Sequence, residues 1–135
     1  MEKLILVSHG AFCEGLKDSV EMILGPQDYI HTAALTPEMG PEDFEKALDA
    51  LIDEGDQVTV FADLLGGTPA NTVSKKIMNG SDLNLYVGMS LPMVMSYING
   101  KMIGEQPDYV QKAQEGIIHI NALLNQDDDD DDDDE

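Results

Sequence analysis

Two short apolar runs that do not alternate with polar residues are the strongest constraint on the fold of this chain. Residues 4–7 read LILV and residues 58–62 read VTVFA. A strand with apolar residues at almost every position is buried on both faces, as in a parallel sheet covered by helices on each side. The first run is followed by apolar residues at helical spacing, at Phe12, Leu16, Val20 and Ile23. The sequence therefore predicts an α/β fold.

The rest of the chain continues the alternation of strands and helices. We expect strands at 29–35 and 83–89, and helices after Pro41, from Pro69 to about residue 78, from Pro92, and briefly after Pro107. The segment GIIHI, residues 116–120, is a possible last, antiparallel strand. This order predicts a single doubly wound, mostly parallel sheet with strand order 2-1-3-4 and helices on both faces.

The composition is that of one compact domain with an acidic tail. The chain has 135 residues, 42% of them hydrophobic, which is enough for one core. We expect a domain over residues 1–126 and a disordered tail over residues 127–135, which read DDDDDDDDE.

The charge of the chain excludes some partners and favours others. The net charge is −20, and removing the nine negative charges of the tail leaves −11 for residues 1–126. All seven basic residues are lysine, so we expect no nucleic-acid binding, which needs a basic face. An acidic body instead favours a basic protein partner through long-range attraction.

The sequence also indicates a compartment. A single cysteine, Cys13, excludes an internal disulfide and suits a reducing environment. The apolar run at the N-terminus is too short for a signal peptide, and no stretch approaches the roughly 20 apolar residues of a membrane span. We expect a cytoplasmic protein.

Two unusual loops begin where predicted strands end. His9-Gly10 follows the first strand, and Asp63 with the segment GGTP, residues 66–69, follows the third. In a 2-1-3-4 sheet these two strands are neighbours, and ligands bind at the carboxyl edge where the strand order reverses. We therefore expect His9 and Asp63 to face each other across that crevice.

These residue types suit the transfer of a phosphoryl group. A neutral imidazole, with a reference pKa of about 6.5, is a nucleophile near pH 7. A carboxylate bonded to one ring nitrogen fixes the tautomer, leaves the other nitrogen free, and stabilises the cation formed by attack. Gly10, Gly66 and Gly67 would let a phosphate approach main-chain amides, and Thr68 is expected to cap the next helix, with Pro69 at its first position. Each helix N-terminus favours an anion by roughly 0.3–1 kcal/mol. No metal or cofactor is expected.

With these motifs the chain resembles the IIA components of the mannose class of the bacterial phosphoenolpyruvate-dependent sugar phosphotransferase system. The resemblance covers about residues 1–120 and rests on Ser8-His9-Gly10, on MILG at residues 22–25, on DLLGGTP at residues 63–69 and on VGMSLPM at residues 87–93. It implies that His9 accepts a phosphoryl group from the carrier protein HPr and passes it to a separate IIB component. It also implies that Asp63 orients the histidine, that Thr68 lies near the phosphate, and that the protein is a homodimer in which a C-terminal strand can cross between subunits.

The chain departs from the pattern of that family at three positions. Leu65 stands where an aromatic residue is common, Ala70 where phenylalanine often follows the proline, and Ser90 where asparagine is usual. These changes leave His9 and Asp63 in place and affect the partner surface and the shape of the loop.

Two other classes share parts of the pattern. A histidine phosphatase or phosphoglycerate mutase also has histidine-glycine after its first strand, but it needs arginines to hold its substrate, and this chain has none. A receiver-like signalling domain would be phosphorylated on Asp63, but it needs an acidic pair after the first strand to hold Mg²⁺, and Ser8 and His9 stand there. His31 and His119 match no zinc-binding spacing with His9.

Overall fold

The computed structural model describes the backbone of residues 1–133 and the side chains of residues 1–126. Its sheet has four parallel strands in the order β2-β1-β3-β4, which confirms the predicted topology. β1 (Glu2–His9) pairs with β2 (Ile30–Leu35) on one side and β3 (Gln57–Ala62) on the other, and β4 (Leu83–Val87) pairs with β3. The strand order therefore reverses between β1 and β3.

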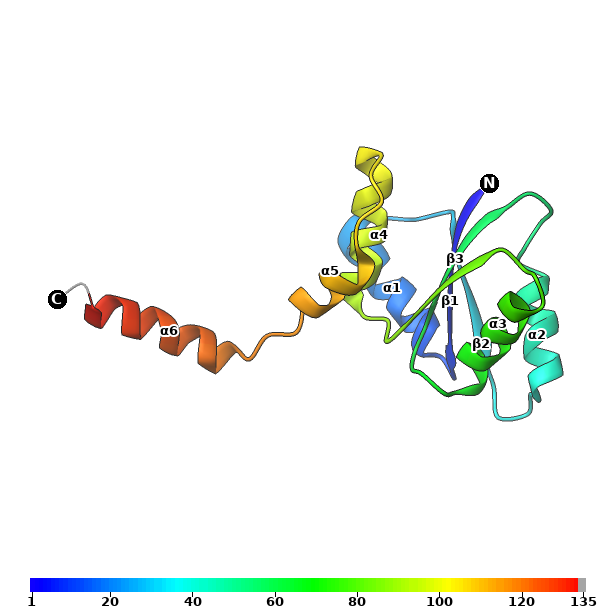
Figure 1. The fold of residues 1–135 in the computed structure, drawn as a ribbon, viewed down its shortest axis with the longest axis horizontal. Helices are drawn as coiled ribbons and strands as arrows, with labels where there is room; N and C mark the ends of the chain where they lie inside the picture. Colours follow the sequence, from blue (N-terminus) through cyan, green and yellow to red (C-terminus); the bar gives the residue numbers. More distant parts are fainter. Residues whose placement is uncertain (134–135) are drawn as a thin grey trace.

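Helices cover both faces of this sheet (Figure 1). α1 (Phe12–Leu24), α4 (Leu91–Ile103) and α5 (Tyr109–Glu115) lie on one face, and α2 (Pro41–Asp49) and α3 (Thr68–Met78) on the other. Along β1, Leu4 and Leu6 enter the core beneath α1 and α4, while Ile5 and Val7 enter the core beneath α2 and α3. Because side chains alternate along a strand, Ser8 lies on the α1 face and His9 on the α3 face.

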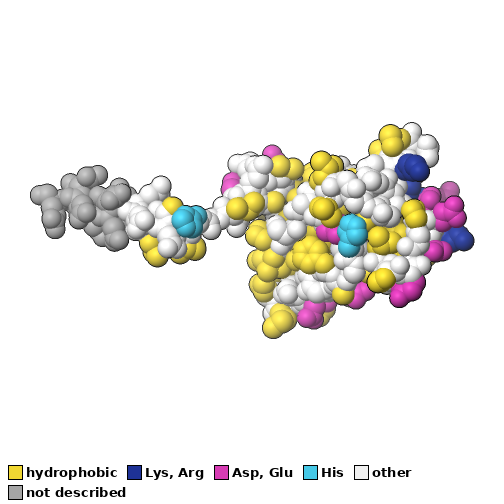
Figure 2. Space-filling model, turned by 90° about the horizontal axis from the view of Figure 1, so that it is seen from below, with side chains coloured by type: hydrophobic (Ala, Val, Ile, Leu, Met, Phe, Trp, Pro, Cys, Tyr) yellow, Lys and Arg dark blue, Asp and Glu magenta, His cyan; other side chains and the backbone are white. Residues whose placement is uncertain are grey.

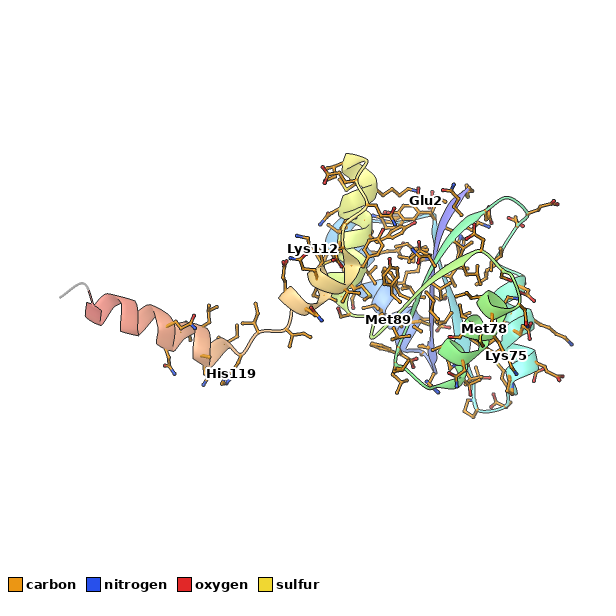
Figure 3. The ribbon with its side chains drawn as sticks, viewed as in Figure 1. Glu2, Lys75, Met78, Met89, Lys112 and His119 are labelled. Carbon is orange, nitrogen blue, oxygen red and sulfur yellow. The ribbon has the colours of Figure 1, made fainter. Side chains whose placement is uncertain are left out.

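Aromatic rings join α4 and α5 to the sheet. The ring of Phe61 in β3 lies 6.2 Å from that of Tyr97 in α4 and 5.5 Å from that of Tyr109 in α5, both edge-on. Tyr109 also meets Tyr86 of β4 edge-on at 5.2 Å. The Tyr97 hydroxyl donates a hydrogen bond to Glu2, which is labelled in Figure 3. Edge-on contacts between aromatic rings stabilise the fold by more than the burial of their apolar surface alone.

An ion cluster occupies the amino edge of the sheet, where β1 begins. The Lys3 amine lies 2.7 Å from an Asp56 carboxylate oxygen and 3.0 Å from Asp53, and it donates to the Leu51 carbonyl. Asp56 also meets the N-terminal amine of Met1 at 3.3 Å. The hydrogen bond from Lys3, helped by the Asp53 N–H, lowers the pKa of Asp56 to about 2. The cluster fastens the loop before β3 to the start of β1.

The C-terminal segment differs from the sequence-based prediction. The predicted strand at 116–120 is wrong: residues 117–119 have no regular structure, and α6 (Ile120–Asp133) begins at the last of these five residues. Ile117 is 81% exposed, and α6 extends away from the body of the molecule (Figure 1). His119, labelled in Figure 3, therefore lies just before a helix and not on a strand.

The disordered tail expected over residues 127–135 stays a prediction, because the side chains of these residues and the backbone of residues 134–135 lie outside the described structure. Within the described part of the chain, no helix combines the length and the apolar character needed to cross a bilayer.

Candidate functional site

The site lies at the carboxyl edge of the sheet, where β1 and β3 end side by side. His9 is the last residue of β1, and Asp63 follows the last residue of β3, Ala62. The register of the two parallel strands places Val7 opposite Ala62, so His9 and Asp63 leave the sheet together. The predicted juxtaposition of the two residues is present in the structure.

One carboxylate oxygen of Asp63 binds His9 twice. Asp63 Oδ2 accepts a hydrogen bond from the His9 backbone N–H at 2.9 Å and lies 2.7 Å from the ring Nδ1. The other oxygen, Oδ1, accepts from the Leu64 N–H at 3.0 Å. An ionised carboxylate is only an acceptor, so in the neutral imidazole Nδ1 carries the proton and Nε2 keeps its lone pair.

The pKa of Asp63 reflects these contacts. Burial pushes the pKa of this carboxyl upward, but the hydrogen bonds from the His9 backbone, the His9 ring and Leu64 outweigh it and hold the pKa below its ordinary value. The Asp63 side chain is 11% exposed, whereas that of His9 is 48% exposed. The carboxylate is thus the anchored, ionised member of the pair, and the imidazole is the accessible one.

The backbone of Gly67 lies close against the imidazole. A methyl carbon placed on Gly67 would lie 2.5 Å from His9 Cε1 and 3.2 Å from Nε2, which is closer than carbon atoms pack. The backbone of Gly67 is extended, at φ −86°, so its conformation suits any residue. Glycine is required here by the contact with His9 alone.

The N-terminus of α3 presents free amides beside this contact. Within the described residues, the N–H groups of Gly66, Gly67 and Thr68 make no hydrogen bond of good geometry, although residues 65–66 lie in a turn. The loop that carries them is held by Asn71, whose side-chain amide donates to the Gly66 carbonyl at 3.2 Å. A helix N-terminus with unpaired amides attracts anions.

Thr68 and Gly10 differ from their expected roles in part. Thr68 is the first residue of α3 and does not cap it: the N-cap is Gly67, and Pro69 is the second residue of the helix. Gly10 forms the turn after β1 with φ 58°, a conformation that suits glycine. The Gly10 N–H donates to the Leu35 carbonyl at 2.8 Å, so this amide is already occupied.

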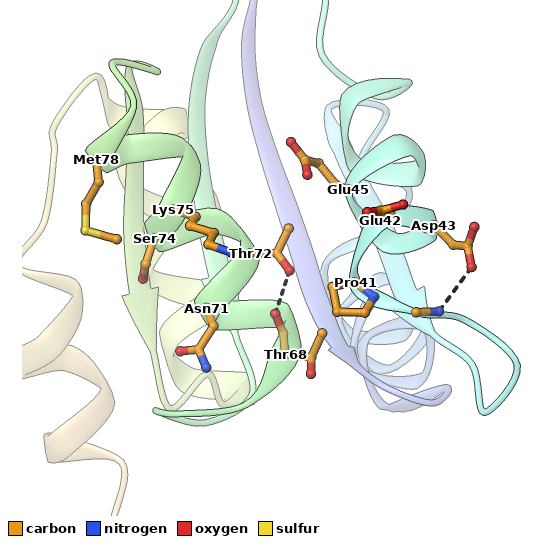
Figure 4. A pocket seen from close by; sticks show the side chains of 11 residues that line it. Pro41, Glu42, Asp43, Glu45, Thr68, Asn71, Thr72, Ser74, Lys75 and Met78 are labelled. Carbon is orange, nitrogen blue, oxygen red and sulfur yellow. Dashed lines mark hydrogen bonds between the residues drawn. The ribbon is translucent and has the colours of Figure 1, made fainter.

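A groove of about 880 Å³ between α2 and α3 borders the site (Figure 4). Thr68 and Asn71 line it from α3, and Pro41 and Glu45 line it from α2. His9 and Asp63 do not line this groove. The imidazole, which is 48% exposed, lies on an open surface, and this suits a protein partner better than a small molecule.

Two residues of the site, Ser8 and Asn71, were assigned no role in it from the sequence. Ser8 is fully buried beside His9, and Asn71 holds the loop that carries Gly66. The alternation of β1 could have placed Ser8 on the buried α1 face, since Leu4 and Leu6 share it. The contact of Asn71 depends on how the loop folds back, which no local pattern shows.

The fold and the site together define an α/β domain with an exposed, aspartate-oriented histidine at the point where its strand order reverses. Residues 3–114 match the family model described as the fructose IIA component of the phosphotransferase system, EIIA-man. The chain belongs to this mannose-class IIA family, as its sequence motifs indicated.

Similar proteins agree with this family. The chain is 25% identical over 118 residues to the sorbose-specific EIIA component of Lacticaseibacillus casei, covering 84% of this chain and 86% of that protein. It is 28% identical to the fructose-specific EIIA component of Bacillus subtilis strain 168 over 73% of this chain and 70% of that one. The crystal structure of a phosphotransferase system EIIA component from Streptococcus agalactiae superposes with a TM-score of 0.82 at 29% identity, covering 90% of this chain and 99% of that one. The chain is thus an EIIA component of a sugar phosphotransferase system.

Proposed function

We propose that the chain is a phosphocarrier in which His9 accepts a phosphoryl group from HPr and passes it to a separate IIB component for sugar uptake. The observation that carries this proposal is the pairing of His9 Nδ1 with Asp63 Oδ2 at 2.7 Å. It leaves Nε2 as the nucleophilic atom on a side chain that is 48% exposed.

The transfer step needs no other reactant. Nε2 of His9 attacks the phosphorus of phosphorylated HPr in line; the new Nε2–P bond forms as the bond from phosphorus to HPr breaks, and HPr leaves with the bonding electron pair. The proton on Nδ1 stays in place, so the ring becomes a cation that Asp63 stabilises. Transfer to IIB is the same step in reverse, with the IIB nucleophile as acceptor.

The N-terminus of α3 is the proposed seat of the transferred group. Gly67 lies against Cε1 and Nε2 of the imidazole, and the free N–H groups of Gly66, Gly67 and Thr68 belong to the same turn. Phosphate oxygens bound to Nε2 would accept hydrogen bonds from these amides. No arginine holds the group, so the phosphate can leave for the next protein.

Exposed apolar side chains on the loop after β3 and at the start of α1 favour a protein as the partner. Leu65 is 81% exposed, Phe12 is half exposed and Leu64 is 49% exposed. Hydrophobic side chains gather on the face of the body shown in Figure 2. The contacts with HPr and IIB would be apolar near His9, while the acidic body attracts basic surfaces from a distance.

A homodimer is the proposed assembly. The described part of the chain leaves C-terminal apolar residues open to solvent: Ile117, Ile118 and Leu124 are each more than half exposed. A second copy would bury them. Light scattering should give a mass near twice that of the 14.7 kDa chain, and a monomer mass at all concentrations would contradict this assembly.

Incubation with phosphoenolpyruvate, enzyme I and HPr should add about 80 Da to the chain. A phosphoryl group on the histidine is lost in acid and kept in base, whereas an acyl phosphate on Asp63, as in a receiver domain, is lost in base. His9→Ala should take up none. Uptake by His9→Ala, or a base-labile product, would overturn the assignment. Phosphorylation on Asp63, as in a receiver domain, would also require its carboxylate to be free, but both of its oxygens accept hydrogen bonds.

The Asp63→Ala variant tests the orienting role. Without the carboxylate the imidazole loses its fixed tautomer and the partner of its cationic form, so the transfer rate should fall by at least about tenfold. Binding of HPr, measured by calorimetry, should change much less. Equal losses of rate and of binding would make Asp63 a docking residue.

A further inference from the structure

The side chain of the residue before the histidine makes two hydrogen bonds. The Ser8 side chain is completely buried. Its hydroxyl donates to the Gly10 carbonyl at 2.9 Å and accepts from the Cys13 N–H at 2.9 Å. Gly10 and Cys13 both follow His9 in the sequence, so the two hydrogen bonds of the Ser8 hydroxyl span the turn after the histidine.

This hydroxyl supplies the cap that α1 lacks. The N-cap residue of α1 is Ala11, which has no side chain to accept a hydrogen bond, and Cys13 is the second residue of the helix. Ser, Thr, Asp or Asn at the N-cap normally accepts from that amide. Here Ser8, three residues before the N-cap position, accepts the hydrogen bond from the Cys13 N–H and thereby joins the start of α1 to the end of β1.

The turn is held on three sides as a result. Ser8 fixes the Gly10 carbonyl, the Leu35 carbonyl of β2 fixes the Gly10 N–H, and Asp63 fixes the His9 N–H. Asp63 and Ser8 act on opposite faces of β1, because residues 8 and 9 alternate across the sheet. These three hydrogen bonds fix the position of the His9 backbone independently of the contacts that the imidazole makes with Asp63 and Gly67.

From this geometry we infer that Ser8 is a positioning residue for phosphoryl transfer: its hydroxyl holds the His9 turn so that the imidazole meets the Asp63 carboxylate in one tautomer. The inference rests on the proposed function of His9. Ser8 does not touch the partner or the phosphoryl group, so its loss should act on the transfer step and not on docking. A small displacement of a reacting group is enough to slow a reaction strongly.

Three variants separate this role from packing alone. Ser8→Ala removes the hydroxyl and should lower the maximal rate of phosphorylation by HPr on the order of tenfold, with KM within about twofold. Ser8→Thr keeps the hydroxyl and should return the rate to within about threefold of wild type. Packing alone predicts the opposite order, because threonine adds a methyl group to a fully buried position. Ser96→Ala is the matched control, since Ser96 is also a buried serine and its hydroxyl donates to the Met93 carbonyl within α4, away from the site.

The tautomer of His9 gives a second measurement, which needs no partner protein. In ¹H–¹⁵N spectra of the side chains, wild type and Ser96→Ala should show His9 protonated at Nδ1, and Ser8→Ala should show a mixture of both tautomers. If the wild type took up no phosphate, the proposed function would fail and this spectrum alone would decide the role of Ser8. If Ser8→Ala does not fold, Ser8→Cys, whose thiol is a weaker hydrogen-bonding group, takes its place. A rate and a spectrum equal to those of Ser96→Ala would overturn the inference.

Discussion

At the scale of single residues, the site depends on how closely a few atoms approach the imidazole. The same Asp63 oxygen accepts from the backbone and from the ring of His9, so the ring cannot turn without losing its bond to the oxygen that also holds the main chain. Gly67 then meets the ring on its Cε1 and Nε2 edge. The nucleophilic nitrogen is thereby confined between a carboxylate and a helix N-terminus.

The Gly67→Ala variant should slow phosphorylation strongly. The new methyl group would fall 2.5 Å from Cε1, so the imidazole must move and its alignment is lost. Misplacement of about 1 Å can cost on the order of 10²-fold in rate. The measurement is the rate of phosphate uptake from HPr at saturating HPr.

Gly40→Ala is the matched control for that change. Gly40 is the N-cap of α2 in the same extended conformation, at φ −88°, and a methyl group there meets nothing closer than 4.0 Å. Both variants should lose about 1 kcal/mol or less in unfolding free energy, because alanine is a poor N-cap. If Gly40→Ala slowed uptake as much as Gly67→Ala, the contact with His9 would not be the cause.

At the scale of elements, the sequence was most informative where burial is complete. The strand over residues 4–7 lies in the centre of the sheet with its residues fully buried, and the order of the first four strands followed from the alternation with helices. His9 and Asp63 were found because each stands at the end of such a strand. Ser8 and the contact of Gly67 were not found, because they depend on the path of the turns and not on a repeating pattern.

The C-terminal segment shows why the prediction failed there. GIIHI has the β-branched residues of a strand, but short apolar runs are ambiguous between strand and helix. Ile120, Leu123 and Leu124 recur at helical spacing, and leucine, alanine and glutamine within α6 are good helix formers. Within the described residues this segment pairs with no strand of the sheet, so the local preference prevails.

The Tyr109→Ala variant tests how α5 is held. Tyr109 is 5% exposed and contacts Phe61, Tyr86 and Tyr97, so the change leaves a cavity and should cost about 3 kcal/mol. Hydrogen exchange in α5 should accelerate more than exchange in β1. Val110→Ala, the next residue along and 48% exposed, should cost about 0.5 kcal/mol or less. Equal costs would mean that the aromatic contacts do not hold α5.

At the scale of the whole molecule, the candidate site and the ion cluster that stabilises the fold lie at opposite edges of the sheet. The carboxyl edge carries the exposed pair of His9 and Asp63, and the amino edge carries the ion cluster around Lys3. Asp56 in that cluster is 4% exposed at its side chain, and it binds both Lys3 and the N-terminal amine. Changes in the cluster should therefore alter stability and leave phosphate uptake unaffected.

The Asp56→Asn variant should change how stability depends on pH. The folded pKa of Asp56 is about 2, below its ordinary value of 3.8. A lowered pKa contributes stability that is present above pH 3.8 and is lost as the pH falls through about 2. The difference in unfolding free energy between wild type and Asp56→Asn, measured in urea, should be largest above pH 4 and should shrink toward pH 2. Protonation of the other carboxyls affects both proteins alike and cancels in this difference.

Asp53→Asn is the control, because its side chain is 82% exposed and should matter little at any pH. A difference for Asp56→Asn that stays constant from pH 6 to pH 2 would show that the carboxylate does not stabilise the fold through its charge.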